Sequence, residues 1–294
     1  KDNLVLVFNG EIYNFHTIRN FLKKVGVEDQ ITSDSEALLH LIEFYNKLDL
    51  LKATQAAIRL IDGDYAFAIW DGQNLAISRD QLGVKPLFYG ENGEIKGFAS
   101  TRQALKEIGI TDINTLKPEH ILYNWQDVAP TQPIYEKVFD GDVSKIDKML
   151  RLSLIKRVDG LYEVGVIFSG GIDSSYLALL LKEISENTPL KIKLYAVGVE
   201  GSKDVEAAIY ASKFLNLDLE ICEVTEDMVR EALPDVIGAI GDDNLMKVGV
   251  GLTTYFATKI VARDGIKVAI SGQCADELFG GYKRYLQSFI DGTL

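Results

Sequence analysis

The sequence predicts two domains, an α+β domain in the first half and an α/β domain with a parallel sheet in the second. Usual domain sizes divide a chain of 294 residues into two units. Short apolar runs separated by turn residues fill the first half, whereas strands and helices alternate in the second. We expect domains at residues 1–128 and 142–294, with a linker at 129–141.

The apolar runs of the first half predict strands, and Gly-Asp, Asp-Gly and Asn-Gly pairs between several of them indicate hairpins. Apolar residues at three- and four-residue spacing predict helices at Asn14–Val25 and Asp34–Tyr45. The linker contains Pro130 and Pro133, and few of its apolar residues recur at the spacing of a helix or a strand. The predicted strands are Leu4–Phe8, Tyr65–Trp70, Leu75–Ser78, Pro86–Tyr89, Gly97–Ser100 and His120–Asn124.

The second half begins with a predicted helix at Asp142–Val158, after which strands and helices alternate. Such alternation builds a parallel sheet with helices on both faces, and ligands of these sheets bind at the carboxyl ends of the strands. The predicted strands are Val164–Phe168, Ile192–Val199, Leu217–Val224 and Ile266–Ile270, and the helices are Ser174–Ser185, Lys203–Leu215, Thr225–Ile240 and Leu252–Arg263.

Composition narrows the classes of function. Hydrophobic residues at 47% and charged residues at 25% are ordinary for a soluble globular protein, and no apolar stretch is long enough to span a bilayer. A net charge of -12 argues against broad binding to nucleic acid or anionic membranes and favours a small-molecule ligand. Cys222 and Cys274 lack metal-site spacing and form no disulfide framework, which predicts a reducing, cytoplasmic location.

The first candidate site is the string Ser169-Gly-Gly-Ile-Asp-Ser-Ser175 between a buried strand and a helix. Its glycines let the backbone approach an anion, its hydroxyls can donate, and the helix start directs free N–H groups to the same place. Asp173 repels phosphate unless a cation intervenes, which implies Mg²⁺. The alternative is a serine helix cap with a tight turn. The full string favours phosphate binding by Ser169, Gly170, Gly171, Asp173, Ser174 and Ser175.

The second candidate site follows the last predicted strand, in Ser271-Gly-Gln-Cys-Ala-Asp-Glu-Leu-Phe-Gly-Gly-Tyr282. Asp276 can share with Asp173 the charge of one Mg²⁺ ion, because an octahedral ion accepts one or two carboxylates plus phosphate oxygens and water. By itself, an acidic pair at positions 276 and 277 is also what a solvated helix start contains. The pairing with the first string makes the metal site the better interpretation.

The string at 169–175 resembles the pyrophosphate loop of the ATP-pyrophosphatases, and together with 271–282 it resembles the asparagine synthetases. The resemblance implies an adenine nucleotide alpha hydrolase-like domain that binds ATP. It assigns the adenine to Ile167, Val197, Ser271 and Gly272. Gln273 departs from the family, which usually has an acidic residue there, and glutamine cannot exchange a proton near neutral pH. Gln273 therefore leaves the acceptor site open.

In the first half, Asn9-Gly-Glu-Ile-Tyr-Asn14 is similar to the glutamine-binding motif of amidotransferases with an amino-terminal cysteine nucleophile. The resemblance implies a glutaminase-like domain of the N-terminal-nucleophile type, with layered antiparallel sheets. It assigns the oxyanion hole to Asn9 and Gly10. It assigns binding of the α-amino group of glutamine to Glu11 and Asp34. Agreement extends to 63–69 and 79–87, although for Arg79 and Asp80 a purely structural role is preferred.

The chemistry of that family requires a cysteine as residue one of the mature chain, and Lys1 cannot replace it. The first residues resemble a strand already under way, so we expect the true terminus upstream; the alternative is an inactive glutaminase domain. The family's phosphate-contacting Lys is also absent before Leu294, where we expect a further segment to follow.

The resemblance covers nearly the whole chain and implies a ligase, a glutamine-dependent asparagine synthetase. Aspartate would react with ATP to give a β-aspartyl adenylate and pyrophosphate, and ammonia from glutamine would expel AMP. Two alternatives stay open, namely a relative that adenylates a different carboxylate and a non-catalytic nucleotide sensor or scaffold. The expected ligands are ATP, Mg²⁺, aspartate and glutamine or ammonia. Nucleic acid and membranes are not expected, and a homodimer is left open.

Overall fold

A computed structural model describes residues 4–27, 30–46, 49–130 and 142–292. The chain divides into two compact units, Lys1–Asp142 and Val143–Leu294, which we describe separately. Most of the predicted linker, residues 131–141, lies outside the described residues. The predicted order of an α+β domain followed by an α/β domain with a parallel sheet is confirmed.

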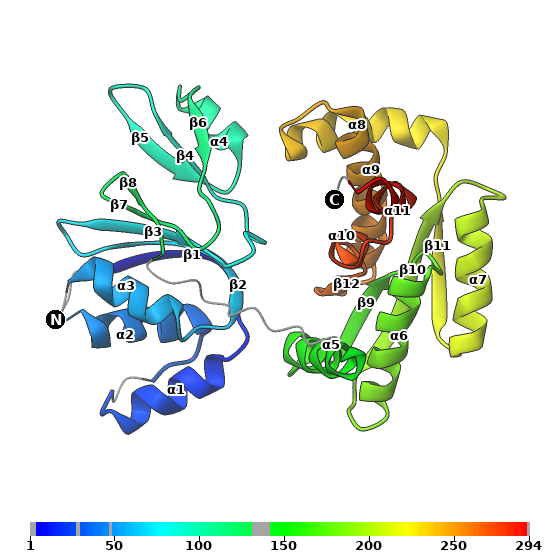
Figure 1. The fold of residues 1–294 in the computed structure, drawn as a ribbon, viewed down its shortest axis with the longest axis horizontal. Coiled ribbons are helices and arrows are strands. Elements are labelled where there is room, and N and C mark those ends of the chain that lie inside the picture. Colours follow the sequence, from blue (N-terminus) through cyan, green and yellow to red (C-terminus); the bar gives the residue numbers. More distant parts are fainter. Residues whose placement is uncertain (1–3, 28–29, 47–48, 131–141, 293–294) are drawn as a thin grey trace. The chain divides into compact units, whose positions relative to one another are not determined.

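The first unit has three layers (Figure 1). Its central layer is a five-stranded antiparallel sheet in the order β1-β2-β3-β7-β8. Three helices cover one face, and a three-stranded antiparallel sheet, β5-β4-β6, covers the other. The elements are β1 (Val5–Ile12), α1 (Phe15–Lys24), α2 (Asp34–Tyr45), α3 (Leu50–Ile58), β2 (Gly63–Trp70), β3 (Leu75–Arg79), β4 (Phe88–Glu91), β5 (Lys96–Ala99), α4 (Arg102–Glu107), β6 (Ile113–Thr115), β7 (Ile121–Tyr123) and β8 (Gln126–Val128).

Alternation along the strands builds two separate cores in the first unit. In β2, Tyr65, Phe67 and Ile69 face the helices, where they pack with buried residues of α1, α2 and α3. Ala66 and Ala68, which point the other way, pack against residues of the smaller sheet. The small side chains on that face let the two sheets approach each other.

The second unit is a four-stranded parallel sheet in the order β11-β10-β9-β12, with helices on both faces. Helices α6 and α7 cover one face, and α9 packs on the other (Figure 1). The elements are α5 (Val143–Val158), β9 (Glu163–Ile167), α6 (Ile172–Ser185), β10 (Lys191–Gly198), α7 (Lys203–Leu215), β11 (Asp218–Glu223), α8 (Glu226–Ile240), α9 (Leu245–Arg263), β12 (Ala269–Ser271), α10 (Ala275–Phe279) and α11 (Lys283–Ile290).

The order of the four strands creates a switch point for ligand binding. The chain moves outward from β9 through β10 to β11 and then returns to place β12 on the other side of β9. In open α/β sheets, the crevice at the carboxyl ends of the strands beside such a reversal binds ligands. Both candidate sites of this half follow strands that meet there, β9 and β12.

Two predicted boundaries were wrong in ways that matter for function. The strand predicted to end at Phe8 continues to Ile12, so Asn9, Gly10 and Glu11 lie on β1 and pair with β2. Helix α9 begins at Leu245 rather than at Leu252, because the Asn244 side chain caps it by accepting N–H bonds.

The glycines of α9 conceal its first turns in the sequence pattern. A Cβ at Gly251 would lie 2.5 Å from Ile240 Cδ1 and 3.0 Å from Val236 Cγ1, so the glycine allows α8 and α9 to pack closely. Tertiary packing thus overrides the low helix propensity of glycine.

Candidate nucleotide and glutamine sites

The loop after β9 is held by weak hydrogen bonds among its own residues. Ser174 Oγ lies 3.2 Å from Ser169 Oγ and donates to the Gly171 carbonyl at 3.3 Å. Ser174 Oγ also accepts the Ser169 N–H at 3.3 Å, and Ser169 Oγ accepts the Gly171 N–H at 3.3 Å. A good N–H···O hydrogen bond spans 2.7–3.2 Å, and a good O–H···O bond is shorter. Each of the four distances is therefore long for its type of bond. The loop is therefore ordered, but its donors are used only loosely.

The start of α6 lies within this loop. The helix begins at Ile172, two residues earlier than predicted, and its Gly171 cap has no side-chain bond to the first turn. The free N–H groups of that turn and the positive end of the helix dipole favour an anion. Asp173, in the same turn, places a carboxylate beside this position.

Gly170 has a packing role in the structure. Its φ of +72° lies in the left-handed region, and a Cβ there would overlap the backbone of Ala207 and Ala208 in α7. The glycine allows α7 to pack against the loop. Gly170 does not line the cavity described next, and neither does Ser175, whose buried Oγ has no hydrogen-bond partner among the described residues.

The second loop contacts the first at Gly272. A Cβ at Gly272 would lie 3.1 Å from Asp173 Cβ and 3.2 Å from the Ser174 nitrogen. The absent side chain thus lets the end of β12 touch the first turn of α6. Two strings that are far apart in the sequence form one surface, as parallel strands on either side of a switch point should.

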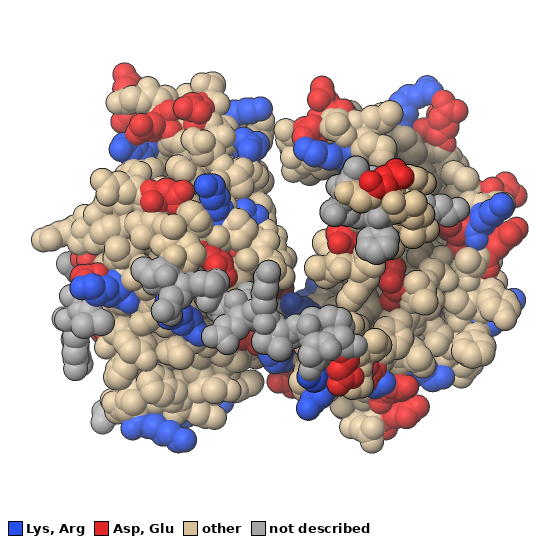
Figure 2. Space-filling model, in the orientation of Figure 1, with Lys and Arg blue, Asp and Glu red and all other residues tan. Residues whose placement is uncertain are grey.

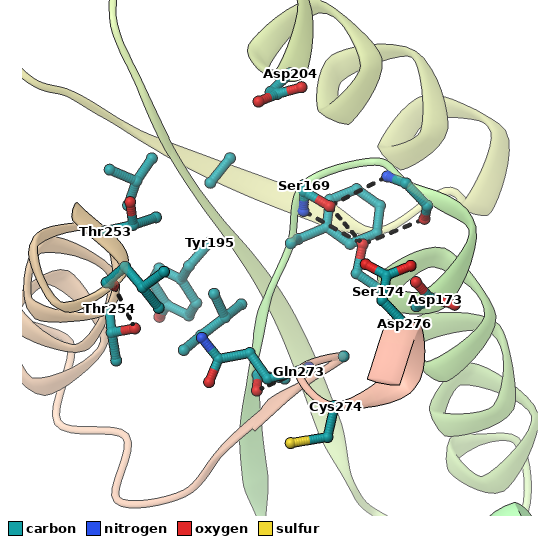
Figure 3. A pocket seen from close by; sticks show the side chains of 18 of the residues that line it. Ser169, Asp173, Ser174, Tyr195, Asp204, Thr253, Thr254, Gln273, Cys274 and Asp276 are labelled. Carbon is teal, nitrogen blue, oxygen red and sulfur yellow. Dashed lines mark hydrogen bonds between the residues drawn. The ribbon is translucent and has the colours of Figure 1, made fainter. Parts of the chain in front are cut away.

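The two loops border a cavity of about 560 Å³ at the carboxyl ends of β9, β10 and β12. In Figure 3, Asp173, Ser174 and Asp276 lie on one side of the view, while Tyr195, Thr253 and Thr254 lie on the other. The predicted residues that line the cavity are Ile167, Ser169, Gly171, Asp173, Ser174, Val197, Ser271, Gly272, Gln273 and Asp276.

Sequence reasoning did not identify several other residues that line the cavity. Thr253 and Thr254 come from α9 and Asp204 from the first turn of α7, and no motif marks these three. Cys274 is the N-cap of α10 and lies within the 271–282 string, where the sequence analysis gave it no role. Tyr195 could have been found, because it lies two residues before Val197 and therefore on the same face of β10.

The charge of the cavity is negative. Its described lining includes Asp173, Asp204, Asp276 and Glu277, and it includes no Lys, Arg or His. Such a wall repels phosphate unless a cation intervenes. The carboxylates of Asp173 and Asp276 have no hydrogen bond or ion pair among the described residues, so both are available as ligands. No group of three or more His, Cys, Asp or Glu side chains suited to a metal occurs in the described parts of the chain.

This donor set fits Mg²⁺ bound with a nucleotide, because that ion takes one or two carboxylates and completes its shell with phosphate oxygens and water. A dedicated site made only of protein ligands would require more carboxylates.

Gln273 and Cys274 form the turn between β12 and α10, and both side chains are exposed. Cys274 has a φ of +73°, a left-handed conformation that is uncommon for residues other than glycine. The turn directs the Gln273 amide into the cavity wall, where it can donate or accept but not transfer protons.

In the first unit, the glutamine-site candidates lie on β1 and at the start of α2. Ser33 and Glu36 form a capping box that fixes the first turn of α2 and with it Asp34. The Asp34 carboxylate accepts the Ile12 N–H at 3.1 Å, which joins the helix start to the end of β1. Burial and the nearby Asp34 raise the pKa of Glu11, while Lys85 opposes the shift. The bond to Ile12 thus brings Asp34 to the strand end that carries Glu11.

Asn9 and Gly10 lie next to these acids on the same strand. The Asn9 amide donates to Ser100 Oγ at 3.2 Å, which leaves its second N–H available. Gly10 also has a structural role, because a Cβ there would overlap the Asp64 carbonyl oxygen of β2. The structure thus groups Asn9, Gly10, Glu11 and Asp34 at one end of an edge strand.

The loop that follows β3 is a framework element. The Arg79 guanidinium donates to the carbonyls of Lys85, Leu116 and Gly83. The buried Asp80 carboxylate accepts N–H bonds from Leu82, Val84 and Lys85 at 3.1, 2.8 and 2.9 Å. Asp80 bonds only within the loop, whereas Arg79 also joins the loop to Leu116, which agrees with the structural role preferred from the sequence.

These features define a class of protein: an α+β unit of layered antiparallel sheets followed by an α/β unit with a serine–glycine loop at a switch point. A glutamine amidotransferase domain model matches residues 1–107, and an asparagine synthase model matches residues 145–292. The chain belongs to the asparagine synthase family.

Curated relatives agree with this assignment. The chain is 37% identical to putative asparagine synthetase [glutamine-hydrolyzing] 1 of Methanocaldococcus jannaschii, over 97% of this chain and 54% of that protein. It is 28% identical to a probable asparagine synthetase [glutamine-hydrolyzing] of Acanthamoeba polyphaga mimivirus, over 96% and 55%. The chain thus spans about half the length of these relatives.

Among solved structures, glutamine phosphoribosylpyrophosphate amidotransferase from B. subtilis, complexed with ADP and GMP, aligns with a TM-score of 0.40 and 20% identity. The alignment covers 78% of this chain and 50% of that one. This similarity is too low to inform function.

Two further findings concern the surface charge of each unit and membrane-spanning helices. On the face drawn in Figure 2, Lys and Arg side chains are interspersed with Asp and Glu side chains over each unit. No helix in the described parts of the chain is long and apolar enough to cross a membrane.

Proposed function

We propose that this chain serves an ATP-dependent, amide-forming ligase that converts aspartate and glutamine, or ammonia, into asparagine and glutamate with release of AMP and pyrophosphate. A β-carboxylate oxygen of aspartate attacks the α-phosphorus of ATP, and the bond to the bridging oxygen of the β-phosphate breaks. Ammonia then attacks the carbonyl carbon of the β-aspartyl adenylate, and AMP leaves.

The observation that carries this proposal is the single cavity bordered by both loops. A ligand there meets the N–H groups of the first turn of α6, the hydroxyls of Ser169 and Ser174, and the carboxylates of Asp173 and Asp276. This combination suits a nucleoside triphosphate with a divalent cation better than any other common ligand. Membership of the asparagine synthase family supports the same interpretation.

Each part of the cavity has a proposed role. Ile167, Val197, Ser271 and Gly272 hold the adenine, while the 169–175 loop binds the phosphates. The first turn of α6 binds and orients the leaving pyrophosphate. Mg²⁺, held by Asp173 and Asp276, would neutralise charge on that leaving group. Gln273 orients the acceptor through hydrogen bonds.

The first unit supplies the nitrogen in this proposal. Glu11 and Asp34 bind the α-amino group of glutamine, since two neighbouring carboxylates attract an ammonium group. Asn9 and Gly10 donate to the oxyanion of the tetrahedral intermediate. The amidotransferase model that matches residues 1–107 supports these assignments. A cytoplasmic location and a homodimer remain predictions.

The test is ATP–pyrophosphate exchange with radiolabelled pyrophosphate. The proposal predicts exchange that requires both Mg²⁺ and aspartate. Exchange that proceeds equally without aspartate would exclude aspartate as the acceptor. ATP binding with no exchange under any condition would favour a nucleotide sensor or scaffold instead.

A second candidate function is adenylation of a different carboxylate, and the position of Gln273 favours it. This side chain lines the cavity where the family usually has an acid. A panel of amino acids and other carboxylates in the same exchange assay separates the two functions. The acceptor is the carboxylate with the highest kcat/KM.

A further inference from the structure

Tyr195 occupies a central place on the α9 face of the sheet. It lies on β10 directly beside Ile167 of β9 and two residues before Val197, the positions proposed to hold the adenine. Tyr195 borders the nucleotide cavity, yet its exposed fraction is 0%. The residue therefore forms part of the cavity wall while presenting almost no surface to a ligand.

The sheet leaves room for this ring. A Cβ at Gly165, on the neighbouring strand, would lie 3.2 Å from Tyr195 Cε2, so a larger residue would crowd the ring. The Tyr195 hydroxyl donates to Asp264 Oδ2 at 2.7 Å. Asp264 is the C-cap of α9. Tyr195 thus joins β10 to the end of the helix that covers it.

Charged residues reinforce the same junction. Lys193 Nζ donates to Glu220 Oε2 at 2.6 Å and also to Asp264, and Arg263 pairs with Glu220. These contacts lower the pKa of Asp264 to about 2, with the Lys193 bond as the largest cause. Burial, followed by the bond to Asp264, raises the pKa of Tyr195 to about 12. Across the physiological pH range, Tyr195 therefore stays protonated and can donate, while Asp264 stays ionised and can accept.

The opposite half of α9 forms part of the cavity. Val250, Thr253 and Thr254 line it, whereas the first residues of the helix are largely exposed, with Leu245 at 84%. Helix α9 therefore has a C-terminal end that is joined to β10 and a cavity-lining part that packs against α8. Figure 3 shows Tyr195 on the same side of the cavity as Thr253 and Thr254.

We propose that Tyr195 is a positioning residue: its ring and its bond to Asp264 set the placement of α9 against β10 and thereby the width of the nucleotide cavity. The proposal rests on the proposed function, in which ATP occupies this cavity. It predicts that the hydroxyl contributes to ATP affinity although it touches no part of the ligand.

The test measures ATP binding by protection of Cys274 from alkylation, quantified by mass spectrometry. Cys274 is exposed and lines the cavity, whereas burial raises the pKa of Cys222 and slows its reaction. Tyr195→Phe keeps the ring and removes the bond. We expect the ATP concentration for half-protection to rise about fivefold, the scale of one hydrogen bond. Tyr210→Phe, at a 76% exposed tyrosine on α7, should leave it within about twofold.

Exchange kinetics add a second readout. We expect Tyr195→Phe to raise KM for ATP by the same factor and to change kcat by less than about twofold, because the reacting groups are untouched. Asp264→Asn, which keeps the tyrosine but weakens its partner, should shift KM in the same direction. Asp218→Asn changes another acid beside the same ion pairs and is the matched control.

The outcomes separate two kinds of failure. If ATP does not protect Cys274 in the unaltered protein, the proposed nucleotide site is wrong. If ATP protects it and both variants match the unaltered protein in half-protection and KM, the positioning role is wrong while the site stands. A lower melting temperature with unchanged ATP dependence also overturns the inference, because the hydroxyl would then serve stability alone.

Discussion

The Arg79–Lys85 loop and the Ser169–Ser175 loop follow strand ends, and each contains an aspartate and a glycine with positive φ. In the first loop, Asp80 is 1% exposed and accepts three N–H bonds. In the second, Asp173 accepts none among the described residues, and the serine bonds are long. A loop that satisfies its own polar groups is framework, whereas a loop that leaves them free is suited to a ligand.

The largest expected effect tests the framework loop. Asp80→Ala would remove a buried carboxylate that accepts three N–H bonds, so we expect the free energy of unfolding of the first unit to fall by about 4 kcal/mol. Trp70 and Trp125 both lie in this unit, so urea unfolding followed by tryptophan fluorescence reports on it alone. Asp80→Asn, which keeps one acceptor oxygen, should lose less. A loss below about 1 kcal/mol for Asp80→Ala would end the contrast between the loops.

The next effect tests the ligand loop. Asp173→Asn and Asp276→Asn should each lower ATP–pyrophosphate exchange about 100-fold, because a neutral amide binds Mg²⁺ poorly. Thermal stability should hardly change, since neither carboxylate has a partner to lose within the described residues. Asp235→Asn, an exposed position on α8, serves as the control. Normal exchange in both loop variants would show that Asp173 and Asp276 do not bind the metal.

The smallest effect extends the contrast to Asp264, whose contacts are saturated like those of Asp80. Its pKa falls from 3.8 to about 2 on folding, so its contribution to stability is complete above about pH 4 and is lost towards pH 2. The pKa of Tyr195 rises from 10.0 to about 12, so its contribution is complete below pH 10 and is lost towards pH 12.

Scanning calorimetry across pH provides the measurement. The difference in melting temperature between the unaltered protein and Tyr195→Phe should stay constant below pH 10 and decrease above it. The corresponding difference for Asp264→Asn should decrease only below about pH 4. Differences that do not vary at either extreme would contradict these assignments.

Local signals predicted much of the fold because hydrophobic period and loop chemistry agree in this sequence. The strand predicted at Val164–Phe168 forms as β9 at Glu163–Ile167, and the helix predicted at Asp34–Tyr45 forms as α2 with those bounds, because in both segments neighbouring residues carry the whole signal. Helix α9 was missed in part because Gly251 allows close packing against α8, and no local pattern reveals that contact. Short elements such as α4 and β6 depend on tertiary contacts in the same way.

The candidate sites show the same division. Ser169, Asp173 and Asp276 occur in strings whose chemistry is readable. Thr253 and Thr254 reach the cavity only because α9 packs beside β10. The role of Tyr195 depends on Asp264, far along the chain, and on the missing side chain of Gly165. Such relations are set by three-dimensional packing and leave no mark in a single sequence.

The position of β12 has a consequence for folding. Its residue Ala269 pairs with Gly165 of β9, so the last strand of the sheet closes a loop that contains β10, β11 and the helices α6 to α9. Contacts of such long sequence separation form late, because the entropy of closing the chain must be met first. The contact of Gly272 with Asp173 belongs to that step. A nucleotide that needs both loops would therefore bind only chains that have completed folding, and its binding would increase the free energy of unfolding.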